Sequence, residues 1–154
     1  MNDAWETPPD LFDKLNDEFL FEVDLCTNGI NSRCDNYSTD IVRFFSEGKY
    51  KVFNSFWMNP PYSRGNINKC MEHAYKISVD NKIVVCLVRF DPSAKWFQEW
   101  VDGKATEVRM LNKRVKFRGA KDSYNFPCCI VMYLEQGKYR HTETDYYIWG
   151  WGDD

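Results

Sequence analysis

The feature that most constrains the fold is the stretch KIVVCLVRF, residues 82–90, which is apolar without a break from Ile83 to Val88. A strand with no polar side is typical of a parallel sheet that helices cover on both faces. Helical and strand patterns alternate around it. Helices are predicted over 7–19, 66–78 and 94–101, and strands over 21–26, 50–58, 82–90, 106–117 and 126–134. This order predicts an α/β three-layer sandwich with a mostly parallel sheet.

Local signals indicate where two of the helices begin. Thr7 is expected to be the N-cap of the first helix and Pro8 its first residue, because proline suits a position whose N–H has no partner. Asp91 or Ser93 is expected to cap the third helix. Residues 27–40 are rich in Asn, Ser and Asp, so we expect them to form a loop.

The length of the chain, 154 residues, suits one domain, and no Gly/Ser linker or internal repeat divides it. We expect residues 1–154 to fold as a single unit. Residues 135–154 are aromatic and acidic, and this tail has two interpretations: it packs on the domain, or it mediates a homodimer. No apolar run approaches the ~20 residues of a membrane span, and the first residues lack a signal-peptide pattern. A soluble, cytoplasmic protein with no membrane partner is therefore expected.

The six cysteines lack the spacing of a disulfide framework or a metal site, since there is no C-x-x-C and the two histidines stand alone. We expect buried free thiols, because Cys behaves as a small apolar residue in a core. No metal is expected.

Charge is unevenly distributed, although the net charge is only −3. Residues 1–40 hold ten acids and two bases, whereas residues 109–121 hold six bases and no acid. The acidic balance argues against binding nucleic acid through bulk charge. The basic stretch has two interpretations, a solvated strand face or a set of phosphate contacts.

Two strands are expected to end at the same edge of the sheet. Asp24 ends the strand over 21–26, and Asn59 follows the strand over 50–58. In open α/β sheets, ligands bind beyond the carboxyl ends of the strands. This edge is therefore the expected location of a functional site.

The tetrapeptide Asn59-Pro60-Pro61-Tyr62 ends its strand abruptly, because proline cannot donate to a sheet and fixes its own backbone. The amide oxygen of Asn59 and the carbonyl of Pro60 are two acceptors on a stiff backbone, and such a pair suits a planar amino group. Tyr62 offers a ring face for a flat heterocycle. The chain has no phosphate loop or nucleophilic Ser or Cys motif, so an electrophile is expected to come from a bound cosubstrate.

Asn-Pro-Pro-Tyr after an apolar strand resembles the catalytic motif of S-adenosylmethionine-dependent amino-methyltransferases, especially DNA adenine-N6 methyltransferases. WETPPDLFDKL (5–15) is similar to the N-terminal cofactor motif of that group, and FEVDLC (21–26) to the strand that ends in its acidic cofactor loop. Residues 88–97, 111–117 and 126–134 resemble later blocks of the small phage-type, Dam-like enzymes. The resemblance implies a Rossmann-like, minimal methyltransferase domain. It also implies methylation of adenine N6 in DNA, in the host cytoplasm if a phage encodes the chain.

The resemblance implies roles for individual residues. S-adenosylmethionine would contact Trp5, Thr7, Pro8, Asp24, Leu25, Cys26 and Asn59, with Asp24 near its methionyl part. The catalytic motif would be Asn59, Pro60, Pro61 and Tyr62. In it, Asn59 and the Pro60 carbonyl would hold the amine of an adenine flipped out of double-stranded DNA, and Tyr62 would stack on the base. DNA contacts are expected from Ser63, Arg64, Arg89, Lys113, Arg114, Lys116 and Arg118.

Some departures from the family pattern leave alternatives open. The chain has DLCTNGIN in place of a Gly-x-Gly loop, and the acid for the cofactor ribose is either Asp35 or Asp40. No separate target-recognition domain fits, so specificity would come from short loops, the basic stretch or a second subunit. Cytosine N4, RNA adenine and protein glutamine are alternative acceptors. A noncatalytic DNA- or protein-binding protein that retains the fold is a further alternative.

Overall fold

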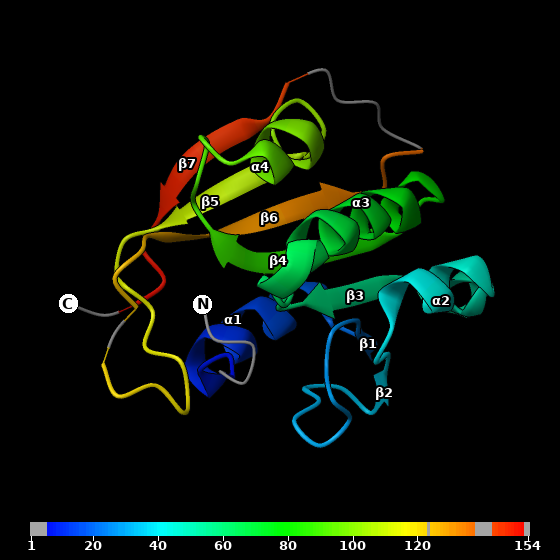
Figure 1. The fold of residues 1–154 in the computed structure, drawn as a ribbon, viewed down its shortest axis with the longest axis horizontal. Helices are drawn as coiled ribbons and strands as arrows, with labels where there is room; N and C mark the ends of the chain where they lie inside the picture. Colours follow the sequence, from blue (N-terminus) through cyan, green and yellow to red (C-terminus); the bar gives the residue numbers. More distant parts are fainter. Residues whose placement is uncertain (1–5, 123, 138–142, 153–154) are drawn as a thin grey trace.

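The computed structural model describes residues 6–122, 124–137 and 143–152 (Figure 1). Four α-helices and seven strands make up this part of the chain, with two short 3-10 turns. The helices are α1 (Pro9–Phe19), α2 (Ile41–Ser46), α3 (Asn66–Val79) and α4 (Lys95–Trp100), and the 3-10 turns are η1 (Lys49–Val52) and η2 (Ser63–Gly65). The strands are β1 (Val23–Asp24), β2 (Asn36–Tyr37), β3 (Ser55–Met58), β4 (Ile83–Arg89), β5 (Glu107–Leu111), β6 (Cys128–Leu134) and β7 (Asp145–Trp149).

The strands form one sheet in the order β2-β1-β3-β4-β6-β5-β7. β4 lies at its centre, parallel to β3 and antiparallel to β6. β6 is also antiparallel to β5, whereas the pairs β1–β2, β1–β3 and β5–β7 are parallel. A single reversed strand therefore interrupts an otherwise parallel sheet, and the predicted mostly parallel α/β sheet is confirmed.

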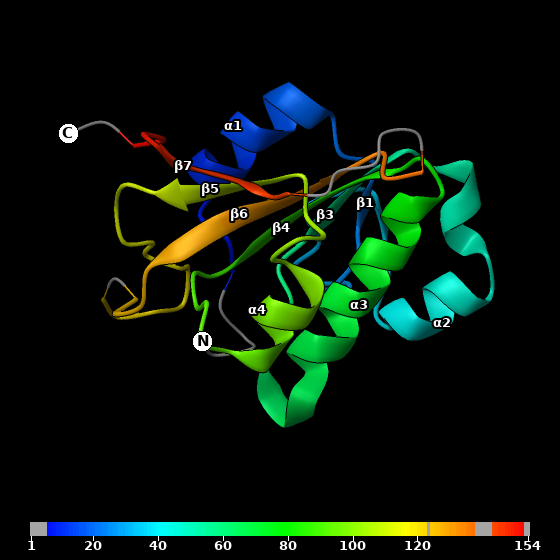
Figure 2. The same cartoon turned by 90° about the horizontal axis from the view of Figure 1, so that it is seen from above.

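Helices cover both faces of the sheet, with α1 on one face and α2, α3 and α4 on the other (Figure 2). Because strand side chains alternate between faces, β4 serves both cores. Val84, Cys86 and Val88 belong to the core under α3 and α4, and Val85 and Leu87 to the core under α1. The run that is apolar on both sides is thus explained, and the three-layer arrangement is confirmed.

The first helix begins later than predicted. α1 starts at Pro9, and Pro8 precedes it in an extended conformation with φ −58° and ψ 136°. The helical region is disfavoured for a residue that precedes proline, so Pro8 is the N-cap of α1 in place of Thr7 and is not the first helical residue. Both of those expectations are wrong. The side chain of Thr7 instead contacts Asn59.

Other predictions fail where elements are short. The predicted loop 27–40 contains β2, whose two residues give no periodic pattern. The N-cap of α4 is Ala94, so neither Asp91 nor Ser93 caps this helix, and the Ser93 hydroxyl donates to the Asp91 carboxylate at 2.7 Å. The strand predicted over 50–58 is confined to β3, because its first residues form η1.

The tail packs on the rest of the chain in its described part. β7 pairs with β5 at one border of the sheet, and Trp151 is buried in the core under α1. Lys14 of α1 donates to the carbonyl of Trp151. Tyr147 and Ile148 stay exposed on β7. The first interpretation of the tail is confirmed, and the homodimer stays a prediction.

All six cysteines are free thiols, four of them buried and two, Cys26 and Cys34, half-buried. In the described ranges, no cluster of three or more His, Cys, Asp or Glu side chains could hold a metal ion. No helix of the described residues is long and apolar enough to span a membrane.

Candidate active site

One edge of the sheet gathers nearly all the predicted site residues. The strands β1, β3, β4 and β5 run in the same direction, so their carboxyl ends lie at this edge, where β6 begins. Asp24 is the last residue of β1, Asn59 follows β3, and Arg89 ends β4. The segment 112–127 leaves from the end of β5 and returns to the start of β6 at the same edge.

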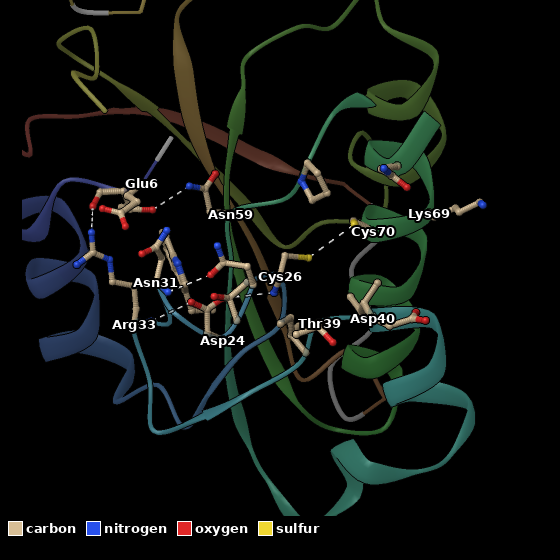
Figure 3. Close-up of a pocket in the computed structure, with 18 of the residues that line it drawn as sticks. Glu6, Asp24, Cys26, Asn31, Arg33, Thr39, Asp40, Asn59, Lys69 and Cys70 are labelled. Atoms are coloured by element: carbon tan, nitrogen blue, oxygen red, sulfur yellow. Dashed lines mark hydrogen bonds between the residues drawn. The ribbon is translucent and has the colours of Figure 1, made fainter. Parts of the chain in front are cut away.

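A cavity of about 740 Å³ opens at this edge (Figure 3), a size that suits a nucleoside-containing cofactor. Five of the predicted cofactor residues line it, namely Thr7, Asp24, Leu25, Cys26 and Asn59. Pro8 is buried and is not among the lining residues. Trp5 lies outside the described residues.

The Asn59 side chain has a defined orientation at the cavity wall. Its amide nitrogen donates to the hydroxyl oxygen of Thr7 at 3.1 Å, and Thr7 itself is only 2% exposed. The Arg33 guanidinium donates to the carbonyl of Thr7, and Glu6 beside it pairs through its backbone with Arg118. Because Thr7 engages the amide nitrogen, the oxygen of Asn59 remains to accept a hydrogen bond from a ligand.

Asp24 is a buried carboxylate at the end of β1, with 3% of its surface exposed. One oxygen accepts from the backbone N–H of Cys26 at 3.3 Å, and the other accepts from the N–H of Arg33 at 3.0 Å. Burial raises the pKa of Asp24 to about 6, although these two N–H groups and the Arg33 charge act in the opposite direction. The loop after β1 therefore surrounds a carboxyl group whose ionised form a cationic ligand would stabilise.

Tyr62 does not line the cavity. Pro61 lines it, whereas Pro60 is buried and is not among the lining residues. The Tyr62 hydroxyl accepts from the backbone N–H of Arg89 at 2.8 Å. Its ring contacts Trp96 edge-to-face at 6.0 Å, and burial raises the pKa of its hydroxyl. The turn thus presents Asn59 to the cavity and Tyr62 to an aromatic cluster.

The cavity also contains residues that the sequence patterns did not predict, among them Arg33, Thr39, Ile41, Val42, Asn66, Lys69 and Cys70. Arg33 had a signal, since it is one of only two bases in the first forty residues. Of the two acids proposed for a ribose, Asp40 lines the cavity, whereas Asp35 is not among its lining residues. Asp40 also accepts from the N–H of Arg43 at 3.2 Å and so caps α2.

The predicted DNA contacts lie at the same edge in two groups. Ser63 and Arg64 follow Tyr62 in η2, and Arg89 ends β4. The second group, Lys113, Arg114, Lys116 and Arg118, belongs to the segment 112–127. β5 ends at Leu111, so these bases lie on a loop and not on a strand face. The choice between a solvated surface and phosphate contacts stays a prediction.

Three contacts define the surroundings of the basic stretch. Arg114 donates to the carbonyl of Asn125, and Arg118 pairs with Glu6 at 3.8 Å. Arg109, in contrast, is held on the α1 side by a bidentate pair with Glu18 at 2.6 and 2.9 Å. Arg109 therefore does not belong to the basic group at the edge.

A mostly parallel α/β sheet, a cofactor-sized cavity at its carboxyl edge and an Asn-Pro-Pro-Tyr turn in the cavity wall together define the class of Rossmann-like methyltransferases. Residues 1–143 match the model of the family DNA N-6-adenine-methyltransferase (Dam). The chain is also 30% identical, over 155 aligned positions, to the DNA N-6-adenine-methyltransferase of Haemophilus phage HP1 (strain HP1c1). That alignment covers 94% of this chain and 86% of the relative.

The chain therefore belongs to the DNA N-6-adenine-methyltransferase family. The resemblance found in the sequence is confirmed. Among the acceptors left open by the motif, family membership selects adenine in DNA over cytosine N4, RNA adenine and protein glutamine.

Proposed function

We propose that this protein transfers a methyl group from S-adenosylmethionine to the N6 amine of an adenine flipped out of double-stranded DNA. The observation that carries the proposal is the Asn59 amide, which Thr7 holds at the wall of the cavity with its oxygen left to accept. S-adenosylmethionine supplies a methyl group on a sulfonium, which needs no activation by metal or by a protein nucleophile. The residues of the chain then have to bind and orient the cofactor and the adenine, and to exclude water from between them.

The charges in the cavity suit the two ends of the cofactor. Its methionyl end is a zwitterion, with an ammonium that an acid attracts and a carboxylate that a base attracts. Asp24 and Arg33 supply one of each, on the side of the cavity near Glu6 and Asn59 (Figure 3). Asp40 and Lys69 lie on the other side, where a ribose and its base would extend over Ile41. Of the two candidate acids, we therefore assign Asp40, and not Asp35, to the cofactor ribose.

Asn59 and Pro60 would position the acceptor amine. The Asn59 oxygen and the Pro60 carbonyl accept its two N–H groups, which directs the nitrogen lone pair toward the methyl group. Proline stiffness keeps the two acceptors fixed before the base arrives, so catalysis is mainly positioning and preorganised dipoles. As the N–C bond forms, the bond between the methyl group and the sulfonium sulfur would break and leave S-adenosylhomocysteine, and the methylated amine would then release one proton to solvent.

The basic residues of segment 112–127 would bind the phosphate backbone next to the flipped base. Lys116 and Arg118 are exposed at the edge where Tyr62 lies, and phosphate contacts position a protein on a duplex without reading its sequence. A base must leave the duplex to reach a catalytic residue in a turn. Such a protein would act in the cytoplasm of the cell that holds its DNA.

The first test is a calorimetric titration with S-adenosylmethionine, followed by transfer of labelled methyl groups to DNA. We expect binding and transfer in the wild type. Absence of heat at millimolar cofactor would contradict the proposal and leave the noncatalytic alternative.

The second test replaces Asn59, the acceptor for the amine. Asn59→Ala should lower transfer by at least about a hundredfold, the usual effect of removing one preorganised dipole, and should lower the affinity for S-adenosylhomocysteine far less. Asn54→Ala is the matched control, since Asn54 is an exposed asparagine at the opposite end of β3. Transfer that persists in Asn59→Ala would refute the role of Asn59.

A further inference from the structure

The ring of Tyr62 is covered by a cation in the DNA-free protein. The guanidinium carbon of Arg89 lies 4.5 Å from the centre of the Tyr62 ring, and 5.3 Å from that of Phe126. This contact conflicts with the proposed function on which the present inference rests, because a flipped adenine has to stack on the same ring. We place the adenine on the ring face that Arg89 covers, so one planar group must leave before the other can bind.

The position of Arg89 follows from the sheet. It is the last residue of β4, which is parallel to β3, so its side chain emerges beside the turn that follows β3. Its backbone N–H donates to the Tyr62 hydroxyl at 2.8 Å, which fixes the backbone at that point and leaves the side chain to move. Trp96, which contacts Tyr62 from another direction, is 6% exposed and belongs to the core. A base that enters from the edge therefore meets the side chain of Arg89 and not that of Trp96.

The guanidinium is incompletely satisfied where it lies. Among the described residues, no acceptor contacts its Nε atom, although this atom is buried. A buried N–H without an acceptor is destabilising relative to a hydrogen-bonded one. A DNA phosphate would supply acceptors in a geometry that guanidinium matches, and a base would restore stacking on the Tyr62 ring. Each of the two separated groups therefore gains a partner when DNA binds.

We propose that Arg89 occupies the stacking position of the target adenine on Tyr62 and is displaced by the base when DNA binds. In the free protein the guanidinium keeps water away from the covered face of the Tyr62 ring and holds the ring in its orientation. In the complex the same side chain moves to the DNA backbone. Arg89 is thus a positioning residue for the Tyr62 ring on which the base stacks.

NMR of the Arg89 side chain tests the proposal directly. The Nε–H of a guanidinium above an aromatic ring has an upfield-shifted resonance, and burial slows its exchange with water. The resonance is assigned by its loss in Arg89→Lys, which keeps the charge without the planar group. Arg109 is the internal control, because its Nε donates to Tyr147 at 2.6 Å on the α1 side and should not respond.

The samples contain S-adenosylhomocysteine and a duplex that the wild type methylates, or the same duplex with an abasic site in place of the target adenine. The proposal expects the upfield shift of Arg89 to be lost with the intact duplex and retained with the abasic one. Retention with both duplexes would overturn it. Loss with both would also overturn it, because the phosphates alone would then move the side chain.

A parallel assay separates this inference from the function on which it rests. If the wild type transfers no methyl group to DNA, the proposed function fails. If it transfers methyl groups to the intact duplex while the Arg89 resonance is unchanged, only the displacement of Arg89 is refuted.

Discussion

The carboxyl edge of the sheet has two halves of different character, on either side of the Asn-Pro-Pro-Tyr turn. The half formed by the ends of β1 and β3 is a cavity with a buried acid, Asp24, and a buried hydroxyl, Thr7. The half formed by the end of β4 and segment 112–127 carries exposed bases and the rings of Tyr62 and Phe126. One half suits a small ligand with opposite charges, and the other suits a polyanion with flat bases.

A four-residue turn separates the two halves. Asn59 and Tyr62 are three residues apart, yet one faces the cavity and the other the aromatic cluster. Two prolines make the connection rigid, and in the proposed function they fix the acceptors for the amine between the cofactor and the DNA. The following predictions test whether the halves are separable.

Among the effects on ligand binding, the strongest is expected for Arg33 in the cavity. Arg33→Met should weaken binding of S-adenosylhomocysteine by roughly ten- to a hundredfold, since a hydrogen bond to a charged group contributes about 1.5–3 kcal/mol. Binding of 5′-methylthioadenosine, which lacks the amino-acid end, should not change. Calorimetry with both ligands measures the difference, and Arg43→Met on α2 is the exposed control. Equal weakening of both ligands would show that Arg33 only supports the loop.

A second prediction concerns the ionisation of Asp24. Since its pKa is about 6 in the fold, affinity for S-adenosylmethionine should rise about tenfold from pH 5 to pH 7, as the carboxylate ionises beside the ligand ammonium. Fold stability should change in the opposite sense. The folded pKa lies above the ordinary value of 3.8. The contribution of Asp24 to the free energy of unfolding is therefore fully present below pH 3.8, and it is lost as the pH rises through about 6.

Asp24→Asn serves as the comparison for both parts of that prediction. It should flatten the pH dependence of affinity, measured by calorimetry, and of unfolding, measured with denaturant. A wild-type affinity that does not vary from pH 5 to pH 7 would contradict the placement of Asp24 beside the ammonium.

A third prediction concerns the link between the halves. Thr7→Val removes the acceptor that orients Asn59, and a hydrogen bond of about 1 kcal/mol predicts a roughly fivefold lower kcat. Affinity for S-adenosylhomocysteine should stay near that of the wild type. Thr7→Ser keeps the hydroxyl and should restore kcat. A Thr7→Ser variant as slow as Thr7→Val would refute the orienting role.

The smallest effect is expected on the basic half. Lys116→Ala should weaken DNA binding severalfold and reduce the salt dependence of log affinity by about 0.9, as for the loss of one phosphate contact. Affinity for S-adenosylhomocysteine should be unchanged. Lys51→Ala is the control, because Lys51 is an exposed lysine in η1, before β3. An unchanged salt slope in Lys116→Ala would remove Lys116 from the DNA surface.

Much of the fold was predictable because its longest elements have strong patterns. α3 spans Asn66–Val79 where helical spacing predicted 66–78, and β4 spans Ile83–Arg89 within the predicted 82–90. β2 and the caps of α1 and α4 were missed, since two paired residues give no period and capping depends on local backbone geometry. Asp24 and Asn59 were correctly placed at one edge, because parallel strands end together.

The α/β class, the family motifs and the separation of acidic and basic segments along the chain can all be read from the amino-acid order. These depend on composition, period and local backbone restriction, which neighbouring residues fix. The tertiary structure decided that Thr7 orients Asn59, 52 residues away, that Arg33 borders the cavity, and that Arg89 covers Tyr62. Such contacts join residues distant in sequence, and they exist only once the packed sheet brings the ends of separate strands to one edge.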